Sequence, residues 1–179
     1  MKKSAIIIGV GIAIATSFLP SFSDAQAKTF EISTDKENGK KVLKGFLNRS
    51  DIETDTSFKW FQENYALGQA DALAVAAFQK NAAKFQMIVF FGTWCHDSQN
   101  LLPVFYRLTD RSGYPSDNIA LIGVDRKLTT LNNLPAAFKI THTPTFIVMK
   151  DGKEIGRVVE YGKYGQIDKE LGEIVVGIE

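Results

Sequence analysis

The sequence predicts an α/β fold whose mixed sheet has parallel strands at its centre, an antiparallel hairpin near the C-terminus and helices on both faces. Two short apolar runs, residues 86–91 and 119–124, are typical of strands that are covered on both sides. A segment with helical spacing of apolar residues follows each run, so the two strands are expected to be parallel. The Asp151-Gly152 pair then predicts a tight turn between two antiparallel strands.

The other elements follow from the same patterns along the chain. Residues 28–40 are polar, and we expect them to be mobile. Apolar and aromatic residues at helical spacing predict helices, and short apolar runs predict strands. The expected strands are residues 41–47, 86–91, 119–124, 145–149 and 154–161, and the expected helices are residues 57–65, 71–84, 95–108, 131–139 and 167–175.

The first 27 residues have the pattern of a secretory signal peptide. A basic start precedes an uncharged, mostly apolar run over residues 5–19, and Ala25-Gln26-Ala27 provides small residues at a cleavage site. At about 1.5 Å per residue, this run is too short as a helix to cross a hydrocarbon core about 30 Å thick. We therefore expect residues 1–27 to be cleaved, and the protein to be exported to the periplasm or secreted.

The remaining chain is expected to form one domain. We assign residues 28–85 to an N-terminal extension that contains the first strand and helices of that domain, and residues 86–179 to its core. Hydrophobic residues make up 45% of the chain and charged residues 23%, an ordinary balance for a globular protein. Without residues 1–27 the numbers of basic and acidic residues are equal, so neither nucleic acid nor a membrane surface is an expected partner. We expect a monomer without a cofactor.

The chain has a single cysteine, Cys95, and therefore cannot form an internal disulfide. Cys95 follows an expected strand and opens an expected helix, where unpaired N–H groups and the helix dipole stabilise a thiolate. His96 adds to this effect when it is protonated, whereas the carboxylate of Asp97 opposes it. Ser98 stands where its hydroxyl can donate a hydrogen bond to the sulfur. These four residues are the candidate catalytic group.

Several motifs in the second half of the chain, in the right order, resemble the thioredoxin superfamily. Residues 90–95 (FFGTWC) look like the strand that leads into the active site of that family, and Pro103 stands where the proline kinks the active-site helix. Residues 140–146 (ITHTPTF) are similar to the loop that carries a cis-proline, and Asp151-Gly152 matches the hairpin turn. The resemblance covers residues 86–176 and implies a thioredoxin-like fold.

The resemblance also implies roles for residues around the thiol. It implies that Pro144 is cis, that Thr143 lends its backbone to an extended substrate segment, and that Cys95 is the attacking sulfur. Trp94 and His142 lie beside these motifs and are further candidates for contact with a substrate. An aromatic ring beside a strand end is as often simple packing, so both interpretations of Trp94 stay open.

Two residues depart from the family pattern. Reductases of the family have C-x-x-C, whereas this chain has C-x-x-S with Ser98 in place of the second cysteine. Val89 stands where the family carries a buried acid, six residues before the first cysteine. A hydroxyl cannot resolve a mixed disulfide, so a dithiol cycle within one molecule is unavailable. The leading hypothesis is therefore monothiol exchange through Cys95 in an isomerase-like, deglutathionylating or client-retaining role, with disulfide- or thiol-bearing proteins or glutathione as partners.

Two alternatives remain open at this point. The first is a thioredoxin-like module that binds peptides or proteins beside Pro144, with the cysteine incidental, because a fold does not by itself define an activity. The second is copper or zinc binding through Cys95, His96 and His142, with Asp97 nearby, because both histidines of the chain fall in motifs expected to converge on the thiol.

Overall fold

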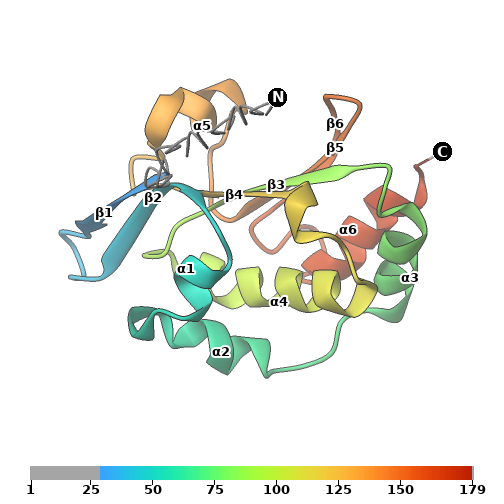
Figure 1. Ribbon diagram of the computed structural model, residues 1–179, viewed down its shortest axis with the longest axis horizontal. Helices are drawn as coiled ribbons and strands as arrows, with labels where there is room; N and C mark the ends of the chain where they lie inside the picture. The colour runs from blue at the N-terminus through green and yellow to red at the C-terminus, as the bar shows by residue number, and fades with distance from the viewer. Residues whose placement is uncertain (1–28, 179) are drawn as a thin grey trace, which may run out of the picture.

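The computed structural model describes residues 29–178. The predicted signal peptide, residues 1–27, lies outside the described residues. The described chain forms a six-stranded mixed sheet with helices on both faces (Figure 1), which confirms the predicted fold class. None of the helices within residues 29–178 has the length and apolar character needed to cross a bilayer.

The sheet has the order β1-β2-β4-β3-β5-β6. Its central strands β3 and β4 are parallel, and β5 and β6 form an antiparallel hairpin at one edge, both as predicted. At the other edge β2 runs antiparallel to β4 and to β1. The strands are β1 (Phe30–Thr34), β2 (Lys41–Leu47), β3 (Gln86–Phe91), β4 (Ile119–Gly123), β5 (Thr145–Lys150) and β6 (Lys153–Val159).

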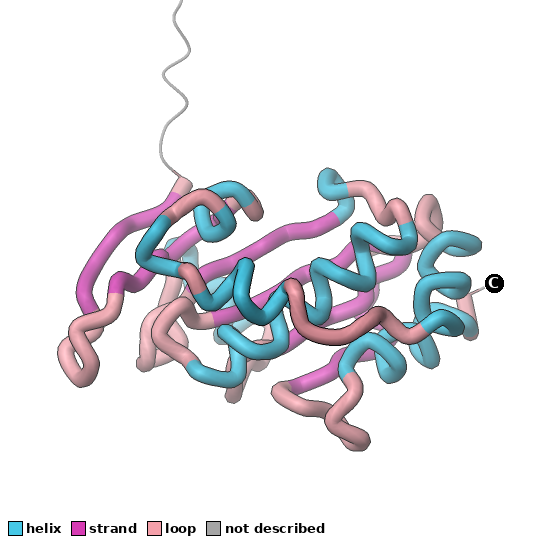
Figure 2. The backbone as a smooth tube through the Cα atoms, turned by 90° about the horizontal axis from the view of Figure 1, so that it is seen from below, coloured by secondary structure: helices cyan, strands magenta, loops and turns pink. Residues whose placement is uncertain are grey.

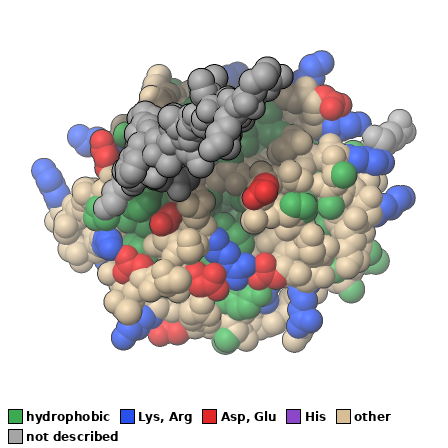
Figure 3. Space-filling model, viewed as in Figure 1, with side chains coloured by type: hydrophobic (Ala, Val, Ile, Leu, Met, Phe, Trp, Pro, Cys, Tyr) green, Lys and Arg blue, Asp and Glu red, His purple; other side chains and the backbone are tan. Residues whose placement is uncertain are grey.

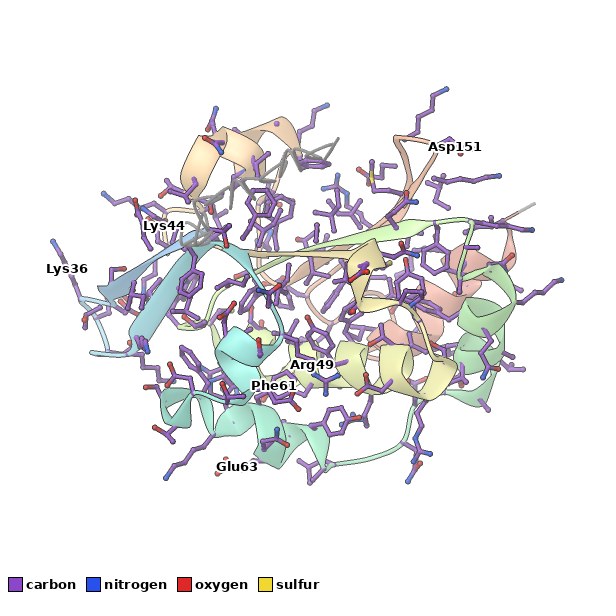
Figure 4. All side chains as sticks on the ribbon, viewed as in Figure 1. Lys36, Lys44, Arg49, Phe61, Glu63 and Asp151 are labelled. Atoms are coloured by element: carbon purple, nitrogen blue, oxygen red, sulfur yellow. The ribbon has the colours of Figure 1, made fainter. Side chains whose placement is uncertain are left out.

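Strand β1 lies within residues 28–40, where the sequence analysis expects a polar, mobile segment and no strand. Four of its five residues are exposed, and its short alternation of Phe30 and Ile32 with polar residues is completed by pairing with β2. The pairing depends on Gly45, opposite Phe30, where a Cβ atom would lie 2.4 Å from the carbonyl oxygen of Thr29. Lys36 projects from the turn between the two strands, away from the body of the molecule (Figure 4).

Most helices lie where the sequence predicts them, but two are interrupted. The segment 57–65 divides into a 3₁₀ turn and α2, and the segment 131–139 divides at Asn132 and Asn133, whose φ angles are positive. The expected helix 71–84 ends three residues early and has Asp71 as its cap. The helices are α1 (Ser50–Glu53), η1 (Thr56–Phe58), α2 (Trp60–Tyr65), α3 (Ala72–Asn81), α4 (His96–Ser112), η2 (Ser116–Asn118), η3 (Leu131–Asn133), α5 (Leu134–Ala137) and α6 (Ile167–Val176).

The sheet separates two hydrophobic layers of different size. The larger layer packs β3 against helices α1 to α4 and α6, and Figure 2 shows these helices in front of the sheet. The smaller layer lies on the other face beneath α5. Because the side chains of β3 alternate between the layers, Val89 and Phe91 are buried in the first and Phe90 in the second. Burying each such side chain contributes about 1.5–3 kcal/mol, so the end of β3 is a firm base for the loop that follows.

Candidate functional site

The single thiol lies at the amino end of α4, at the edge where β3 ends. After β3, a tight turn is closed by the amide of Cys95, which donates to the carbonyl oxygen of Gly92 at 3.0 Å. Cys95 is the N-cap residue of α4, with φ −83° and ψ 126°, and its side chain makes no capping hydrogen bond. The residue is partly buried, so the sulfur is held by the fold and still meets solvent.

The sulfur contacts the loop that leads into β5. The thiol of Cys95 donates to the carbonyl oxygen of Thr143 at 3.2 Å. The Thr143–Pro144 peptide bond is cis, as the resemblance implied, and both residues are buried. The carbonyl oxygen of Pro144 accepts from the amide of Glu160 at 2.8 Å, which ties this loop to the end of β6. The structure thus brings Cys95, Thr143 and Pro144 together.

Ser98 makes a different contact from the one that the sequence suggested. Its hydroxyl accepts a hydrogen bond from the amide of Gly92 at 3.1 Å, and the side chain is fully buried. Within residues 29–178 no hydrogen bond joins Ser98 to the sulfur of Cys95, so that expectation is wrong. The turn takes Gly92 out of the sheet, and its buried amide needs an acceptor that Ser98 provides. Ser98 therefore stabilises the turn that carries the thiol.

The polar residues proposed as metal ligands do not converge. His96 is exposed on the first turn of α4 and Asp97 is partly buried beside it. His142 is also exposed, and its Nδ1 lies 3.0 Å from the hydroxyl of Thr141. The described part of the chain contains no group of three or more histidine, cysteine, aspartate and glutamate side chains that could hold a metal ion. The residue set proposed for copper or zinc therefore does not form a site.

Trp94, the residue before the thiol, is fixed by contacts on three sides. Its indole Nε1 donates to the carbonyl oxygen of Val124 at 2.9 Å, and the guanidinium of Arg126 lies 4.7 Å from the ring centroid. On the third side is Gly92, where a Cβ atom would come within 2.6 Å of Nε1. Any larger residue at position 92 would displace the ring. The ring of Trp94 is thus packed in the fold, and the residue directly precedes the thiol in the chain. Simple packing and contact with a substrate are therefore both compatible with its position.

Arg126 is a site residue that the sequence analysis missed. Its Nε donates to both oxygens of Asp35, at 3.0 and 2.9 Å, and its Nη1 lies 3.0 Å from Oε2 of Glu37. The hydrogen bond from Arg126 holds the pKa of the Asp35 carboxyl below its usual range. The same hydrogen bond is the main reason why the pKa of Arg126 is raised, and negative charge on Cys95 acts in the same direction. The guanidinium is therefore held by carboxylates over the ring of the residue that precedes the thiol.

The turn before the thiol is also tied to the edge of the sheet. The hydroxyl of Thr93 donates to the carbonyl oxygen of Lys41 at 2.8 Å and accepts from the amide of Leu43 at 3.3 Å. The side chain amide of Gln99 donates to the carbonyl oxygen of Thr93 at 2.8 Å. The backbone of the turn is thus fixed by β2 on one side and by α4 on the other.

A thiol at the start of a helix, opposite a cis-proline loop in a mixed sheet, is the arrangement of a thioredoxin-like protein. The family model described as Thioredoxin matches residues 70–173, more than half of the chain. The chain therefore belongs to the thioredoxin family. The match contains the loops of Cys95 and Pro144 and leaves outside it an N-terminal segment, residues 29–69, that carries β1, β2, Asp35 and Glu37.

Several known proteins are similar to this chain. A thioredoxin of Coprinus comatus is 33% identical over 79 residues, which is 44% of this chain and 71% of that protein. A thioredoxin of Chlamydia pneumoniae is 32% identical over 91 residues, which is 50% of this chain and 78% of that protein. Among solved structures, a Fasciola hepatica thioredoxin is 23% identical with a TM-score of 0.39, over 58% of this chain and 89% of that chain.

Proposed function

We propose that this protein is an exported monothiol enzyme that exchanges disulfides through Cys95. Membership of the thioredoxin family supports thiol-disulfide chemistry in general. The observation that carries the finer proposal is the position of the sulfur, which is partly buried at the start of α4 and 3.2 Å from the carbonyl oxygen of Thr143. A cysteine at such a position meets a substrate and has helix N–H groups close by to stabilise its thiolate.

The first chemical step is attack by the Cys95 thiolate on a substrate disulfide. A bond forms between the sulfur of Cys95 and one substrate sulfur, while the substrate S–S bond breaks. The other substrate sulfur leaves with the bonding electron pair as a thiolate and takes a proton from solvent. No net oxidation has occurred at this point, because one disulfide has been replaced by another.

The second step needs a thiol from outside this chain, because the only cysteine is already in the mixed disulfide. Another cysteine of the client can attack, which releases Cys95 as a thiolate and leaves the client with a rearranged disulfide. When the mixed disulfide contains glutathione, a second glutathione attacks and is oxidised to its own disulfide. Isomerisation and deglutathionylation are therefore both open to a single sulfur.

The substrate is proposed to bind across the two loops that meet at the sulfur. An extended client segment would lie along the backbone of Thr143 beside Pro144, with Trp94 and His142 at its sides. The face of the molecule in Figure 3 carries basic and acidic side chains interspersed with apolar ones. His96 and Asp97, on the first turn of α4, would adjust the charge around the thiolate.

The place of action is proposed from the sequence pattern of residues 1–27, which is that of a secretory signal. A protein released into the periplasm or the external medium meets clients whose disulfides persist, because these compartments are oxidising. A thiol that rearranges disulfides has substrates there. Expression of the full chain, followed by N-terminal sequencing of the exported product, tests cleavage after Ala27.

The chemistry is tested with purified protein in two assays, reactivation of scrambled ribonuclease and release of glutathione from a glutathionylated peptide. We expect activity from the wild type and none from Cys95→Ser, because the hydroxyl cannot form the mixed disulfide. Ser33→Ala, on the exposed side of β1, is the control and should keep full activity. Wild-type activity that survives in Cys95→Ser would overturn the proposal.

The same variants separate exchange from simple binding. If the wild type is inactive in both assays, but still binds an unfolded client as tightly as Cys95→Ala does, the peptide-binding alternative replaces the enzyme. Ser98→Cys gives a further check, because it restores a second sulfur one helical turn from the first. We expect this variant to form an internal disulfide and to reduce insulin with dithiothreitol as the electron source, which the wild type should not do efficiently.

A further inference from the structure

An arginine outside the motifs of the family joins the N-terminal segment to the active-site turn. Arg126 follows β4 in a loop, and its partners Asp35 and Glu37 lie in the turn between β1 and β2. Asp35 is 91 residues away in sequence and only 7% exposed, whereas the side chain of Arg126 is 35% exposed and that of Glu37 is 68% exposed. The ion pair is therefore a long-range contact that is shielded from water on the side of Asp35 and open to water on the side of Glu37. The family match does not include this turn.

The ion pair fixes the plane of the guanidinium. Two hydrogen bonds from Nε to Asp35 and one contact from Nη1 to Glu37 use donors on both sides of the group. The flat face that remains lies over the indole of Trp94 at 4.7 Å, which is a cation–π distance. The indole is held from the other side by its bond to the carbonyl oxygen of Val124. The position of the ring of Trp94, the residue before Cys95, is thus set by the carboxylates of a distant turn.

The guanidinium also contributes charge at the site. The nearby groups that can carry charge are His96 and Asp97 on α4, His142 in the loop before β5, and the Arg126 cluster. The guanidinium of an arginine stays protonated at all pH values at which the protein is folded. Arg126 is therefore the only one of these groups with a permanent positive charge, and a positive charge close to a sulfur favours the thiolate.

We propose that Arg126, held by Asp35 and Glu37, is a positioning residue that orients the Trp94 ring beside Cys95 and keeps a positive charge close to the sulfur. The N-terminal segment thereby sets the reactivity of a thiol that lies in the family-matched part of the chain. The consequence for exchange rests on the proposed function. The geometry and the reactivity of the thiol do not, because they are measured without a substrate.

The first test measures the rate of alkylation of Cys95 by iodoacetamide at neutral pH. We expect Arg126→Gln to lower this rate about threefold to tenfold, because the thiolate loses a nearby positive charge. Arg126→Lys keeps the charge and should restore the rate to within about twofold of wild type. A purely structural role would not be rescued in this way. Equal rates in wild type and Arg126→Gln, with unchanged circular dichroism, would overturn the electrostatic part of the proposal.

The second test follows the Trp94 ring by fluorescence in a Trp60→Phe background, which leaves Trp94 as the only tryptophan. Arg126→Gln and Arg126→Lys should both shift the emission, because a lysine cannot stack as a guanidinium does. Asp35→Asn should shift it as well, but only when Arg126 is present, since Asp35 acts through that side chain. A shift of equal size in the Arg126→Gln background would show that Asp35 acts independently, and the proposed coupling would be wrong.

The two tests also distinguish failure of this proposal from failure of the proposed function. If scrambled ribonuclease is not reactivated by the wild type, the enzyme assignment fails, while the alkylation and fluorescence results still decide the role of Arg126. If exchange is active and unaffected by Arg126→Gln, and alkylation is unaffected too, the enzyme assignment survives and the role of Arg126 does not.

Discussion

Two arginines join the N-terminal segment to the rest of the chain, and the two are built alike. Each guanidinium is held by two carboxylates and lies over one or more aromatic rings. About a third of each side chain is exposed, 27% for Arg49 and 35% for Arg126. The partners are Glu53 and Asp110 for Arg49, and Asp35 and Glu37 for Arg126.

The two arginines differ in the rings that they contact and in the end of α4 at which those rings lie. Arg49 lies over three rings, those of Phe61 and Tyr65 in α2 and that of Tyr106 in the carboxyl half of α4. Figure 4 shows Arg49 beside Phe61. Arg126 lies over Trp94, at the other end of that helix and next to the thiol. A guanidinium that is held by two carboxylates therefore packs over aromatic rings at both ends of α4. At the carboxyl end it stabilises the packing of the rings, and at the amino end we propose that it orients the Trp94 ring.

The comparison predicts that Arg49→Met has the largest effect on stability. The change removes the cation over three rings and leaves Asp110 with only the hydroxyl of Tyr65, at 2.7 Å. We expect a loss of about 2 kcal/mol in the free energy of unfolding, reduced from the value for a fully buried pair because the side chain is partly exposed. Urea denaturation measures it. Arg126→Gln should cost less than about 1 kcal/mol, and equal losses for the two variants would remove the distinction.

Gly92→Ala should disturb both stability and the site, to a smaller extent. The added methyl group would lie 2.6 Å from Nε1 of Trp94, so the ring must leave its place between Arg126 and the carbonyl oxygen of Val124. We expect a loss of about 1–2 kcal/mol and a shifted Trp94 emission. Gly177→Ala is the matched control, because the nearest atom to a Cβ there is 3.8 Å away and the change should be close to neutral. An unchanged emission spectrum for Gly92→Ala would contradict the packing described for Trp94.

The sequence was sufficient for the parts of this molecule that local patterns determine. The apolar run of β3, the turn at Asp151-Gly152 and the thiol at the start of α4 are each visible within a few residues, and the structure has them at the expected positions. The contact between Cys95 and Thr143 was predicted only from the resemblance to a family, because the sequence of neither segment specifies the other.

The parts that escaped prediction all depend on contacts between distant segments. Strand β1 pairs with its neighbour β2, and its own pattern is only two apolar residues, Phe30 and Ile32, in a polar segment. The bond from Gly92 to Ser98 depends on how the turn folds, and Asp35 is separated from Arg126 by 91 positions. Charged residues on a polar segment give no sign of a partner so far away, and the cluster at the site became visible only in three dimensions.

The ion pair of Arg126 should also give the site a sensitivity to acid. Because Arg126 depresses the pKa of Asp35 below 3.8, the pair contributes fully above the pKa of the unfolded chain and is lost as pH falls through the lower, folded value. In the Trp60→Phe background we expect the Trp94 emission to stay constant down to about pH 4 and to change below it. Asp35→Asn should remove this transition. A transition that persists in that variant would have another origin, such as Asp55, whose pKa is also lowered.

The smallest effects are expected from the two polar residues that the sequence placed first around the thiol. His96 is exposed and Asp97 is partly buried, and both lie on the first turn of α4, where water screens their charges. We expect His96→Gln and Asp97→Asn each to change the alkylation rate of Cys95 by less than about twofold. Arg126 is held in one place by two carboxylates, whereas these side chains are free to turn toward solvent. If either variant changed the alkylation rate as much as Arg126→Gln does, residues next to Cys95 in sequence would affect the thiol as strongly as the guanidinium that is held in place. The proposed role of Arg126 would then not explain the reactivity of this sulfur.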